Sequence, residues 1–438
     1  MRPLALILFF CFPLASFVYA GLVNGPMLSQ LDMREAKIWV QARTPSVARV
    51  YYEKVDNPQR SYWTAPVETD VQRGHTAVLT LDQVEPDTSY RYQVELNGER
   101  VGRESEFSTL DNYFERTPPP DFRFVVGGAH YVTEDGFEPP YRTLGAGYDI
   151  FNSIAEAKPA FMIWVGNTAH LRPADWSTRS GYLKRFAQAR TVPQLGPLLA
   201  TIPHYAIWGQ TDYGAPQGGH LSSTRQIAED SFTAFWPRPI QVAQLDGVMT
   251  QFRYADVDFF LLDVRSYRND TPDSNSRVEI LGAEQIAWVR QALIESAATF
   301  KIVVAGAPIL NPADSRENLS FAEREHTELL QMMRDERING LFFLSGGKSY
   351  GELTKLVHAN SYNLYDLTLG PLTAEPGESG EELNFFRAPG SSTFERHFAV
   401  IECAGKEAER ALTLRVLSVE GKEIWNRRIP ASELQTAE

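Results

Sequence analysis

The chain has 438 residues, of which 43% are hydrophobic and 22% charged, so it has the composition and length of a globular protein with two domains or one large one. The formal net charge is −13, and no cluster of lysine and arginine residues forms a track along which a phosphate backbone could bind. Nucleic acid is therefore excluded as an expected partner.

The first twenty residues differ from the rest of the chain. Arg2 supplies a positive start, residues 4–18 are almost wholly apolar, and small or compact residues precede a cleavage position after Ala20. This pattern predicts a signal peptide over 1–20 and a secreted or periplasmic protein with no transmembrane segment after cleavage. A membrane anchor is disfavoured because the stretch is short and contains Pro13. Cys403 is then the one remaining cysteine, which we expect to be a buried small hydrophobe without a disulfide.

Residues 21–117 have the pattern of an all-β domain. Apolar and polar residues alternate over 37–42, and 48–52 and 77–81 behave similarly. The segment 81–94 resembles the tyrosine corner of fibronectin type III sandwiches, in which a Tyr hydroxyl binds backbone just upstream, and we assign that role to Tyr90. Asn97 and Gly98 predict a hairpin turn.

The three prolines at 118–120 mark a domain boundary, because successive prolines stiffen the chain and cannot continue a sheet. Beyond them, over 121–430, strand-like and helix-like stretches alternate, which is typical of an α/β sandwich. Expected central strands are 258–262 and 301–305, and expected helices are 283–297 and 321–336. From about residue 363 the chain is predicted to be rich in β-structure, with a hairpin turn at 420–421.

Four short loops each follow an apolar run of strand character. The loops read GGAH at 127–130, GN at 166–167, WGQTDYG at 208–214 and SGGKSYGEL at 345–353, and the preceding runs are 122–126, 161–165, 205–208 and 341–344. Neither the two adjacent glycines at 346–347 nor the serines around them form a recognisable phosphate-binding loop or catalytic triad.

These loops resemble those of the PhoD-like alkaline phosphatase family, a branch of the binuclear metallophosphoesterases, which read approximately GSCQ, GD, WDDHDYG and SGDRHxxEL. Residues 262–268 (LDVRSYR) and 281–288 (LGAEQIAW) also match the family's LDxRxYR and LGxxQxxW. The resemblance covers nearly all of the chain after residue 20. It implies an α/β protein in which a fibronectin type III-like β-sandwich precedes a four-layer α/β sandwich of the metallophosphoesterase type.

The same resemblance implies that most metal ligands have been lost. The family's cysteine ligand falls on Ala129 and its bridging aspartate on Asn167, while Asp212 alone keeps a carboxylate in the third loop. The degenerate positions are Ala129, Asn167, Gly209, Gln210, Thr211, Asp212, Gly347 and Ser349. We therefore expect no catalytic group and no metal ion, with Asn167, Gln210, Asp212 and His130 as residual candidate ligands. If the site were active, Ca, Fe, Mn or Zn would be the expected ions.

Several residues near the loops have more than one interpretation. His130, His170 and His204 could rebuild a metal site, and His130 or His170 could serve a metal-free hydrolase, but an isolated histidine near a loop is usually a solvated or hydrogen-bonded residue. Lys348 could bind an anion, although a solvated surface lysine is the favoured interpretation. Asp212 and Tyr213 are expected to hydrogen-bond within their own loop.

Two further groups of residues are expected to be structural. Asp263 and Arg265 are interpreted as an ion pair or a loop anchor. Aromatic residues on or near the loops could line a groove, although core packing explains most aromatics in a chain of this size. They are Tyr131, Trp176, Tyr182 and Tyr213.

Two functions remain open. The first is a secreted, catalytically inactive relative that binds an unknown ligand or protein at the former active-site cleft. The alternative is an active alkaline phosphatase or phosphodiesterase with a divergent metal site.

Overall fold

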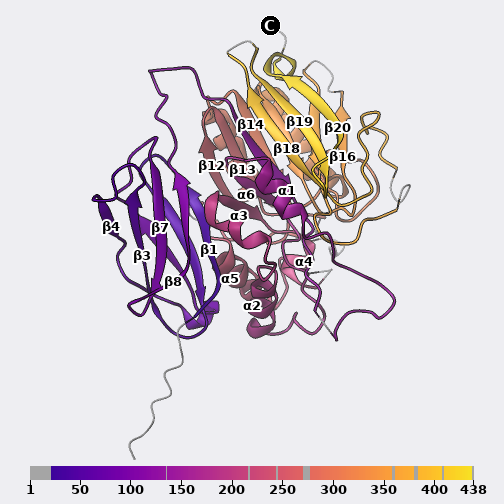
Figure 1. Ribbon diagram of the computed structural model, residues 1–438. Helices are drawn as coiled ribbons and strands as arrows, with labels where there is room; N and C mark the ends of the chain where they lie inside the picture. Colours follow the sequence, from indigo (N-terminus) through magenta and orange to yellow (C-terminus); the bar gives the residue numbers. More distant parts are fainter. Residues whose placement is uncertain are drawn as a thin grey trace, which may run out of the picture.

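The computed structural model describes residues 21–134, 136–215, 218–242, 245–269, 277–357, 361–378, 383–406 and 409–436. The predicted signal peptide, residues 1–20, lies outside these residues. A β-sandwich formed by the first part of the chain packs beside a larger α/β domain (Figure 1). No helix in the described ranges combines the length and apolar character needed to cross a membrane.

The β-sandwich consists of two antiparallel sheets. The first contains, in spatial order, β1 (Leu22–Leu31), β2 (Ala36–Ala42) and β6 (Thr76–Leu81). The second contains β4 (Ser61–Trp63), β3 (Val47–Lys54), β7 (Ser89–Leu96) and β8 (Glu99–Ser108), with β5 (Val67–Glu68) paired to β3. A short 3-10 helix, η1 (Val71–Arg73), precedes β6.

Two local predictions for the β-sandwich are confirmed. The hydroxyl of the buried Tyr90 accepts a hydrogen bond from the backbone N–H of Glu85 at 2.8 Å, which is the contact expected of a tyrosine corner. Asn97 and Gly98 join β7 to β8 with φ angles of 51° and 88°. Positive φ at both central residues is the requirement of a type I′ hairpin turn, which matches the twist of the strands.

Strand β2 is buried on both faces, whereas alternation alone suggested one buried side. Ile38 and Val40 face the core of the β-sandwich, and Trp39 joins the core of the α/β domain. The Trp39 indole Nε1 donates to the carbonyl of Ala234 at 2.7 Å. Tyr92 makes a second such contact, because its hydroxyl donates to the carbonyl of Ala200 at 2.7 Å. Both domains therefore share a buried, hydrogen-bonded interface.

The α/β domain is built on two six-stranded sheets. The spatial order of the first is β11 (His204–Ile207), β10 (Met162–Val165), β9 (Phe122–Gly127), β18 (His397–Ala404), β19 (Ala411–Ser418) and β20 (Glu423–Pro430). The spatial order of the second is β12 (Thr250–Tyr254), β13 (Val257–Leu262), β14 (Phe300–Ala305), β15 (Leu341–Ser345), β17 (Leu364–Thr368) and β16 (Glu352–Leu356). Strands β9, β10 and β11 are parallel, as are β13, β14, β15 and β17.

Helices connect the parallel strands and complete a four-layer α/β sandwich. Three of them belong to the first sheet: α1 (Ile150–Glu156), α2 (Arg179–Gln188) and α3 (Leu195–Thr201). Two more belong to the second sheet: α6 (Ala283–Glu295) and α7 (Glu323–Asp335). The remaining helical elements are α4 (Gln210–Tyr213), α5 (Arg225–Phe235), η2 (Leu319–Phe321) and η4 (Ala431–Leu434). The two long helices and the central strands predicted for this part of the chain are confirmed within a few residues.

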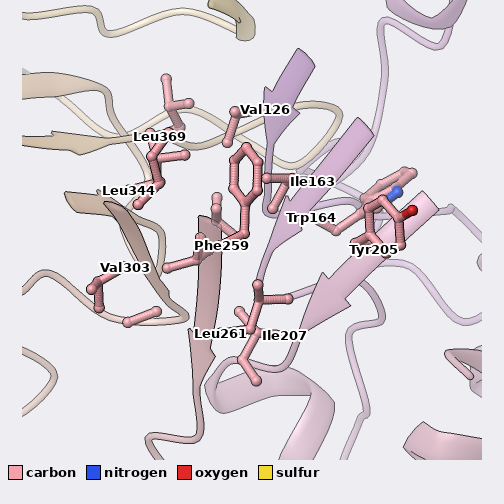
Figure 2. Close-up of a cluster of buried hydrophobic side chains, with 14 of the residues drawn as sticks. Val126, Ile163, Trp164, Tyr205, Ile207, Phe259, Leu261, Val303, Leu344 and Leu369 are labelled. Carbon is pink, nitrogen blue, oxygen red and sulfur yellow. The ribbon is translucent and has the colours of Figure 1, made fainter. Parts of the chain in front are cut away.

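The core lies between the two large sheets, whose inner faces carry mainly aliphatic and aromatic side chains (Figure 2). Phe259 from β13 packs edge-on against Phe124 and Phe161 of the opposite sheet, with ring centroids 5.3 and 5.4 Å apart. Such edge-to-face pairs place the positive rim of one ring against the negative face of the other. Cys403 lies within this core, where burial raises the pKa of its thiol to about 12, as expected of a small buried hydrophobe.

Candidate functional site

The four predicted loops meet at one edge of the α/β domain. Each begins where β9, β10, β11 or β15 ends, and the backbone joins neighbouring loops directly. The N–H of Ala129 donates to the carbonyl of Gly166 at 3.1 Å, and the N–H of His130 donates to the carbonyl of Asn167 at 2.8 Å. The chain therefore retains the strand-end convergence on which an α/β active site is built.

Glycine backbone fills the centre of this meeting point. A Cβ atom at Gly346 would overlap the carbonyl oxygen of Val165, and one at Gly306 would overlap the carbonyl oxygen of Trp208. A Cβ atom at Gly347 would lie 2.7 Å from the carbonyl oxygen of Gly306. Real Cβ atoms do not approach backbone so closely, so the loops pack against each other only because side chains are absent.

Asn167 connects the second loop to the third. Its backbone has a φ of 54°, and its Oδ1 accepts a hydrogen bond from the backbone N–H of Thr211 at 3.0 Å. A Cβ atom at Gly209 would collide with that same Oδ1. The Asn167 amide thus serves the first turn of α4, and position 209 has no room for the carboxylate that the resemblance places there. Ala129, with a φ of 51°, packs against Tyr131 and offers no donor atom.

Asp212 is fully buried and already serves as a hydrogen-bond acceptor on both oxygens. Oδ1 accepts from the Thr168 hydroxyl at 2.8 Å and from the Ala169 N–H at 2.7 Å, and Oδ2 accepts from the Gly209 N–H at 2.9 Å. The last bond lies within the loop, as predicted, but the first two reach the second loop. Burial raises the pKa of this carboxyl to about 6, although its hydrogen bonds act in the opposite direction.

This shifted pKa makes the stability contributed by Asp212 depend on pH. The folded pKa of about 6 lies above the ordinary 3.8, so the folded state binds a proton that the unfolded state releases between those values. The wild-type protein should therefore gain stability relative to Asp212→Asn as the pH falls through 6. We expect the unfolding free energy of the wild type minus that of Asp212→Asn to increase by about 1.4 kcal/mol as the pH falls from 8 to 5.

Urea denaturation of both proteins across this pH range measures this difference. Other titrating groups, including Asp366, whose pKa burial also raises to about 6, are present in both proteins and cancel in the difference. A free-energy difference, wild type minus variant, that stays constant or decreases towards pH 5 would contradict the raised pKa of Asp212.

Glu317 is a member of the site that sequence reasoning missed. Gln210 donates to its Oε1 at 3.3 Å, the buried Arg265 forms an ion pair with it, and Arg268 lies 3.9 Å away. Of the two roles suggested for Asp263 and Arg265, an ion pair or a loop anchor, the contacts support the second, because Asp263 Oδ1 accepts from the backbone N–H groups of Arg265 and Ser266 at 2.8 and 2.9 Å.

The fourth loop also differs from expectation. Lys348 is only 8% exposed and its ammonium donates to the hydroxyl of Ser315 at 3.2 Å, so the favoured interpretation as a solvated surface lysine is wrong. The hydroxyl of Ser345 donates to Asp366 at 2.7 Å. Ser349 contributes its backbone carbonyl, which accepts from Gly377 at 2.8 Å. These contacts stabilise the loop and leave no activated nucleophile.

Two of the three histidines near the loops, His130 and His204, are held by hydrogen bonds inside the fold. His130 is buried, and its two ring nitrogens lie 2.8 Å from the Thr373 hydroxyl and 2.8 Å from the carbonyl of Ala189. Burial lowers the pKa of His130 to about 4. His204 is likewise buried, with Nδ1 accepting from the Trp164 indole at 3.1 Å and Nε2 3.2 Å from a carbonyl. The ring of His170 packs edge-on against Tyr131 with centroids 5.0 Å apart, and burial lowers its pKa to about 3.

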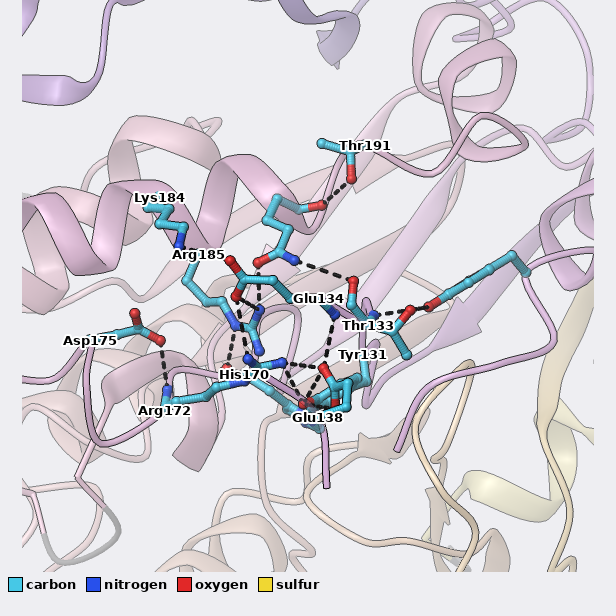
Figure 3. A network of polar contacts seen from close by, with 12 residues as sticks. Tyr131, Thr133, Glu134, Glu138, His170, Arg172, Asp175, Lys184, Arg185 and Thr191 are labelled. Carbon is cyan, nitrogen blue, oxygen red and sulfur yellow. Dashed lines mark hydrogen bonds and ion pairs between the residues drawn. The ribbon is translucent and has the colours of Figure 1, made fainter. Parts of the chain in front are cut away.

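A polar network beside the first two loops ties them to α2 (Figure 3). Arg172 donates to the Tyr131 hydroxyl at 2.8 Å and forms ion pairs with Glu134 and Glu138. From α2, Lys184 approaches Glu134 at 2.8 Å. No sequence pattern indicated this network, because its members are scattered over fifty residues. The basic and acidic side chains of this network pair with one another. Tyr131 is packed within the network and does not line a groove.

The other aromatics near the loops are also packed inside the fold. Tyr182 and Tyr213 are fully buried, and the Tyr182 hydroxyl donates to the carbonyl of Tyr213 at 2.8 Å. Trp176 is half-buried, and its indole donates to the carbonyl of Leu171 at 3.2 Å. Core packing thus accounts for this group.

The residues at the meeting point do not fit a pair of divalent cations. Within the described part of the chain, no three or more His, Cys, Asp or Glu side chains are grouped so as to hold a metal ion. Asn167 and Gln210 are neutral amides, and both oxygens of Asp212 already accept protein N–H or O–H groups. A binuclear centre requires several anionic or imidazole donors that converge, and this chain does not supply them here.

Comparisons with known proteins agree with this architecture. The family model described as PhoD-like phosphatase matches residues 126–397, and a model described as a domain of unknown function (DUF7800) matches residues 19–113. The chain belongs to the PhoD-like phosphatase family. No curated protein shows significant sequence similarity to it.

Two solved structures share the fold over most of the chain. A structure of PhoD has a TM-score of 0.70 and 13% identity, covering 92% of this chain and 91% of its own. Purple acid phosphatase PPD1 from yellow lupin (Lupinus luteus) seeds has a TM-score of 0.70 and 14% identity, covering 93% of this chain and 74% of its own. At these identities the matches establish the fold.

Proposed function

We propose that this protein is a non-hydrolytic member of the PhoD-like phosphatase family, which uses the retained fold to bind a ligand or a protein partner. One observation carries the proposal. The strand-end loops converge as an active site requires, yet they meet through glycine backbone and neutral side chains instead of metal ligands. A fold that is kept without the groups that perform the chemistry is suited to binding rather than to turnover.

Charge balance disfavours a binuclear metal centre in these loops. Two divalent cations held close together repel each other strongly unless anionic ligands, including a bridging one, compensate. The amide of Asn167 carries no net charge, and the one carboxylate in the third loop, Asp212, faces Thr168 and Ala169 inside the fold. Redirecting Asp212 towards an ion would leave these buried donors without a partner, which costs about 1–3 kcal/mol for each group.

We further propose the organisation of the whole chain. Residues 1–20 act as a signal peptide, so the protein is secreted or periplasmic, and residues 21–117 and 121–430 form the two domains. The fibronectin type III-like character of the first domain is supported by the tyrosine-corner contact of Tyr90. Half-buried polar side chains of Gln210, Thr211 and Ser349 lie where the loops reach the surface and offer hydrogen-bonding groups to a ligand.

The test is a combined measurement of metal content and turnover on the mature protein. We expect less than one equivalent of any metal by mass spectrometry, and no hydrolysis of a chromogenic phosphate monoester or diester with added Ca²⁺, Fe³⁺, Mn²⁺ or Zn²⁺. A catalytically active PhoD assayed in parallel shows that the conditions support the reaction.

Metal-dependent turnover that Asn167→Ala abolishes would overturn the proposal. Asn57→Ala, an exposed change in the β-sandwich, is the matched control and should leave any such turnover unchanged. Circular dichroism of both variants separates a lost activity from a lost fold, because the Asn167 side chain also holds the first turn of α4.

A further inference from the structure

A groove of about 650 Å³ lies between the β-sandwich and the α/β domain, beside the linker that joins them. Its walls come from β8 and the end of β1, from the linker residues 109–111 and 113–114, and from the α/β residues 253–255. None of the four strand-end loops contributes to it. A groove of this volume is within the range of small-molecule sites, and such sites occur preferentially between domains.

Aromatic rings form the floor of this interdomain groove. Tyr113 and Phe114 stack with centroids 4.4 Å apart, and Tyr254 lies 4.7 Å from Phe122. Phe114 is 48% exposed, although it belongs to the groove lining. Exposed aromatic faces carry partial negative charge and attract cations, especially cations with a low cost of desolvation.

Two tyrosine hydroxyls in this floor have no protein partner. Tyr113 is only 8% exposed, yet its hydroxyl makes no hydrogen bond to any residue in the described ranges, and burial rather than hydrogen bonding raises its pKa. The hydroxyl of the half-buried Tyr254 also makes no hydrogen bond to a residue in the described ranges, and burial raises its pKa to about 12. Both hydroxyl oxygens are open to the groove rather than sealed in the core, so they can hydrogen-bond a polar ligand that enters it.

The charge of the groove is negative. Its lining carries five carboxylates and one guanidinium, Arg253, which Asp258 holds in a bidentate contact at 2.6 and 2.7 Å. Arg253 therefore has its charge compensated outside the groove. The five carboxylates belong to Asp32, Asp87, Glu106, Asp111 and Asp121.

Three of these carboxylates have no basic partner. Glu106 pairs with Arg91 at 3.0 Å and Asp121 with Arg410 at 2.8 Å, whereas no ion pair involves the other three within the described ranges. The backbone segments that carry Asp87 and Asp111 are joined, because the N–H of Asp87 donates to the carbonyl of Leu110, the residue before Asp111, at 3.1 Å. A rim of this kind favours a positive ligand and disfavours an anion.

We propose that the interdomain groove binds a small organic cation, an ammonium group attached to an apolar body. The ammonium lies against the face of Phe114 and between Asp87 and Asp111, and the apolar body covers Phe122. The hydroxyls of Tyr113 and Tyr254 hydrogen-bond any polar substituent. This binding site is separate from the strand-end loops, so it does not depend on whether those loops hydrolyse phosphoesters.

Isothermal titration of the mature protein tests the proposal with defined probes. Choline and its uncharged isostere 3,3-dimethylbutan-1-ol differ in charge, and benzyltrimethylammonium adds an apolar ring. We expect choline to bind more tightly than the isostere, benzyltrimethylammonium to bind more tightly than choline, and both affinities to fall as NaCl is added.

Variants locate the site. The double change Asp87→Asn and Asp111→Asn should weaken choline binding about fivefold to tenfold, and Phe114→Ala about threefold. Asp82→Asn, an exposed carboxylate outside the groove, should change nothing. All of these positions except the half-exposed Phe114 are on the surface, so folding is preserved. Equal affinity for the uncharged isostere, unchanged affinity in the double variant, or no binding of either cation at millimolar concentration would each overturn the proposal.

Discussion

Replacing Gly346 by alanine should destabilise the protein by about 3 kcal/mol or more, the largest effect that we expect from adding a single methyl group. The added Cβ atom would overlap the carbonyl oxygen of Val165, which belongs to β10 and cannot move without disturbing the sheet. The two large sheets meet at this point, so relief of the overlap requires a shift of one strand end against the other. Urea denaturation, read as a change in midpoint at constant slope, measures the loss.

Gly98→Ala provides a demanding control. Gly98 has a φ of 88° and no atom within 4 Å of an added Cβ, so its substitution carries only the backbone penalty, about 1 kcal/mol. Gly346 has no positive φ, and its entire penalty comes from crowding. Equal losses for the two variants would show that the strand ends can separate easily. That result would also weaken the argument that the loops are closed against metal ligands.

Replacing Asp263 by alanine should cost about 3–5 kcal/mol, because several buried donors lose their acceptor together. Oδ1 accepts from the Trp208 indole at 2.7 Å and from the backbone N–H groups of Arg265 and Ser266 at 2.8 and 2.9 Å. Oδ2 accepts from the N–H of Val248 at 2.9 Å. This single carboxylate therefore fixes the end of β13 and the indole that begins the third loop.

Asp246→Ala is the matched control for Asp263→Ala. The Asp246 side chain is 85% exposed and its contact with Arg225 is 3.8 Å long, so its removal should change stability by less than about 0.5 kcal/mol. If Asp263→Ala does not fold, Asp263→Asn keeps one acceptor and gives a measurable intermediate loss. A loss below about 1 kcal/mol for Asp263→Ala would contradict the anchoring role.

The sequence predicts the fold well because the relevant signals are local. Apolar runs such as 161–165 are long enough to mark a buried strand, and the turn at 97–98 needs only two residues with positive φ. The tyrosine corner is also contained within a few residues around Tyr90. The meeting of the four loops follows from their position after parallel strands, which share one carboxyl edge.

The interactions of the site could not be predicted in the same way, because they join distant parts of the chain. Glu317 and Arg265 are separated by 52 residues in the sequence, and no motif near either residue indicates that they form an ion pair. Lys348 resembled a surface lysine because its neighbours are polar and small, and only the fold brings Ser315 over it. Gly306 carried no motif, yet its missing side chain is what allows the second sheet to touch Trp208. The sequence shows which residue types occupy the loops, but it does not show which distant residues contact them in the fold.

The hydrogen bonds that Trp39 and Tyr92 make across the domain boundary limit how the molecule can be divided. A fragment cut at the proline-rich linker would expose an indole and a phenol that are dry in the intact chain, together with carbonyl groups that lose their donors. The first domain is therefore packed against the second as part of one folded unit, and it is not an independent module on a flexible linker. Substitutions on either side of this interface are therefore constrained by the surface that they face.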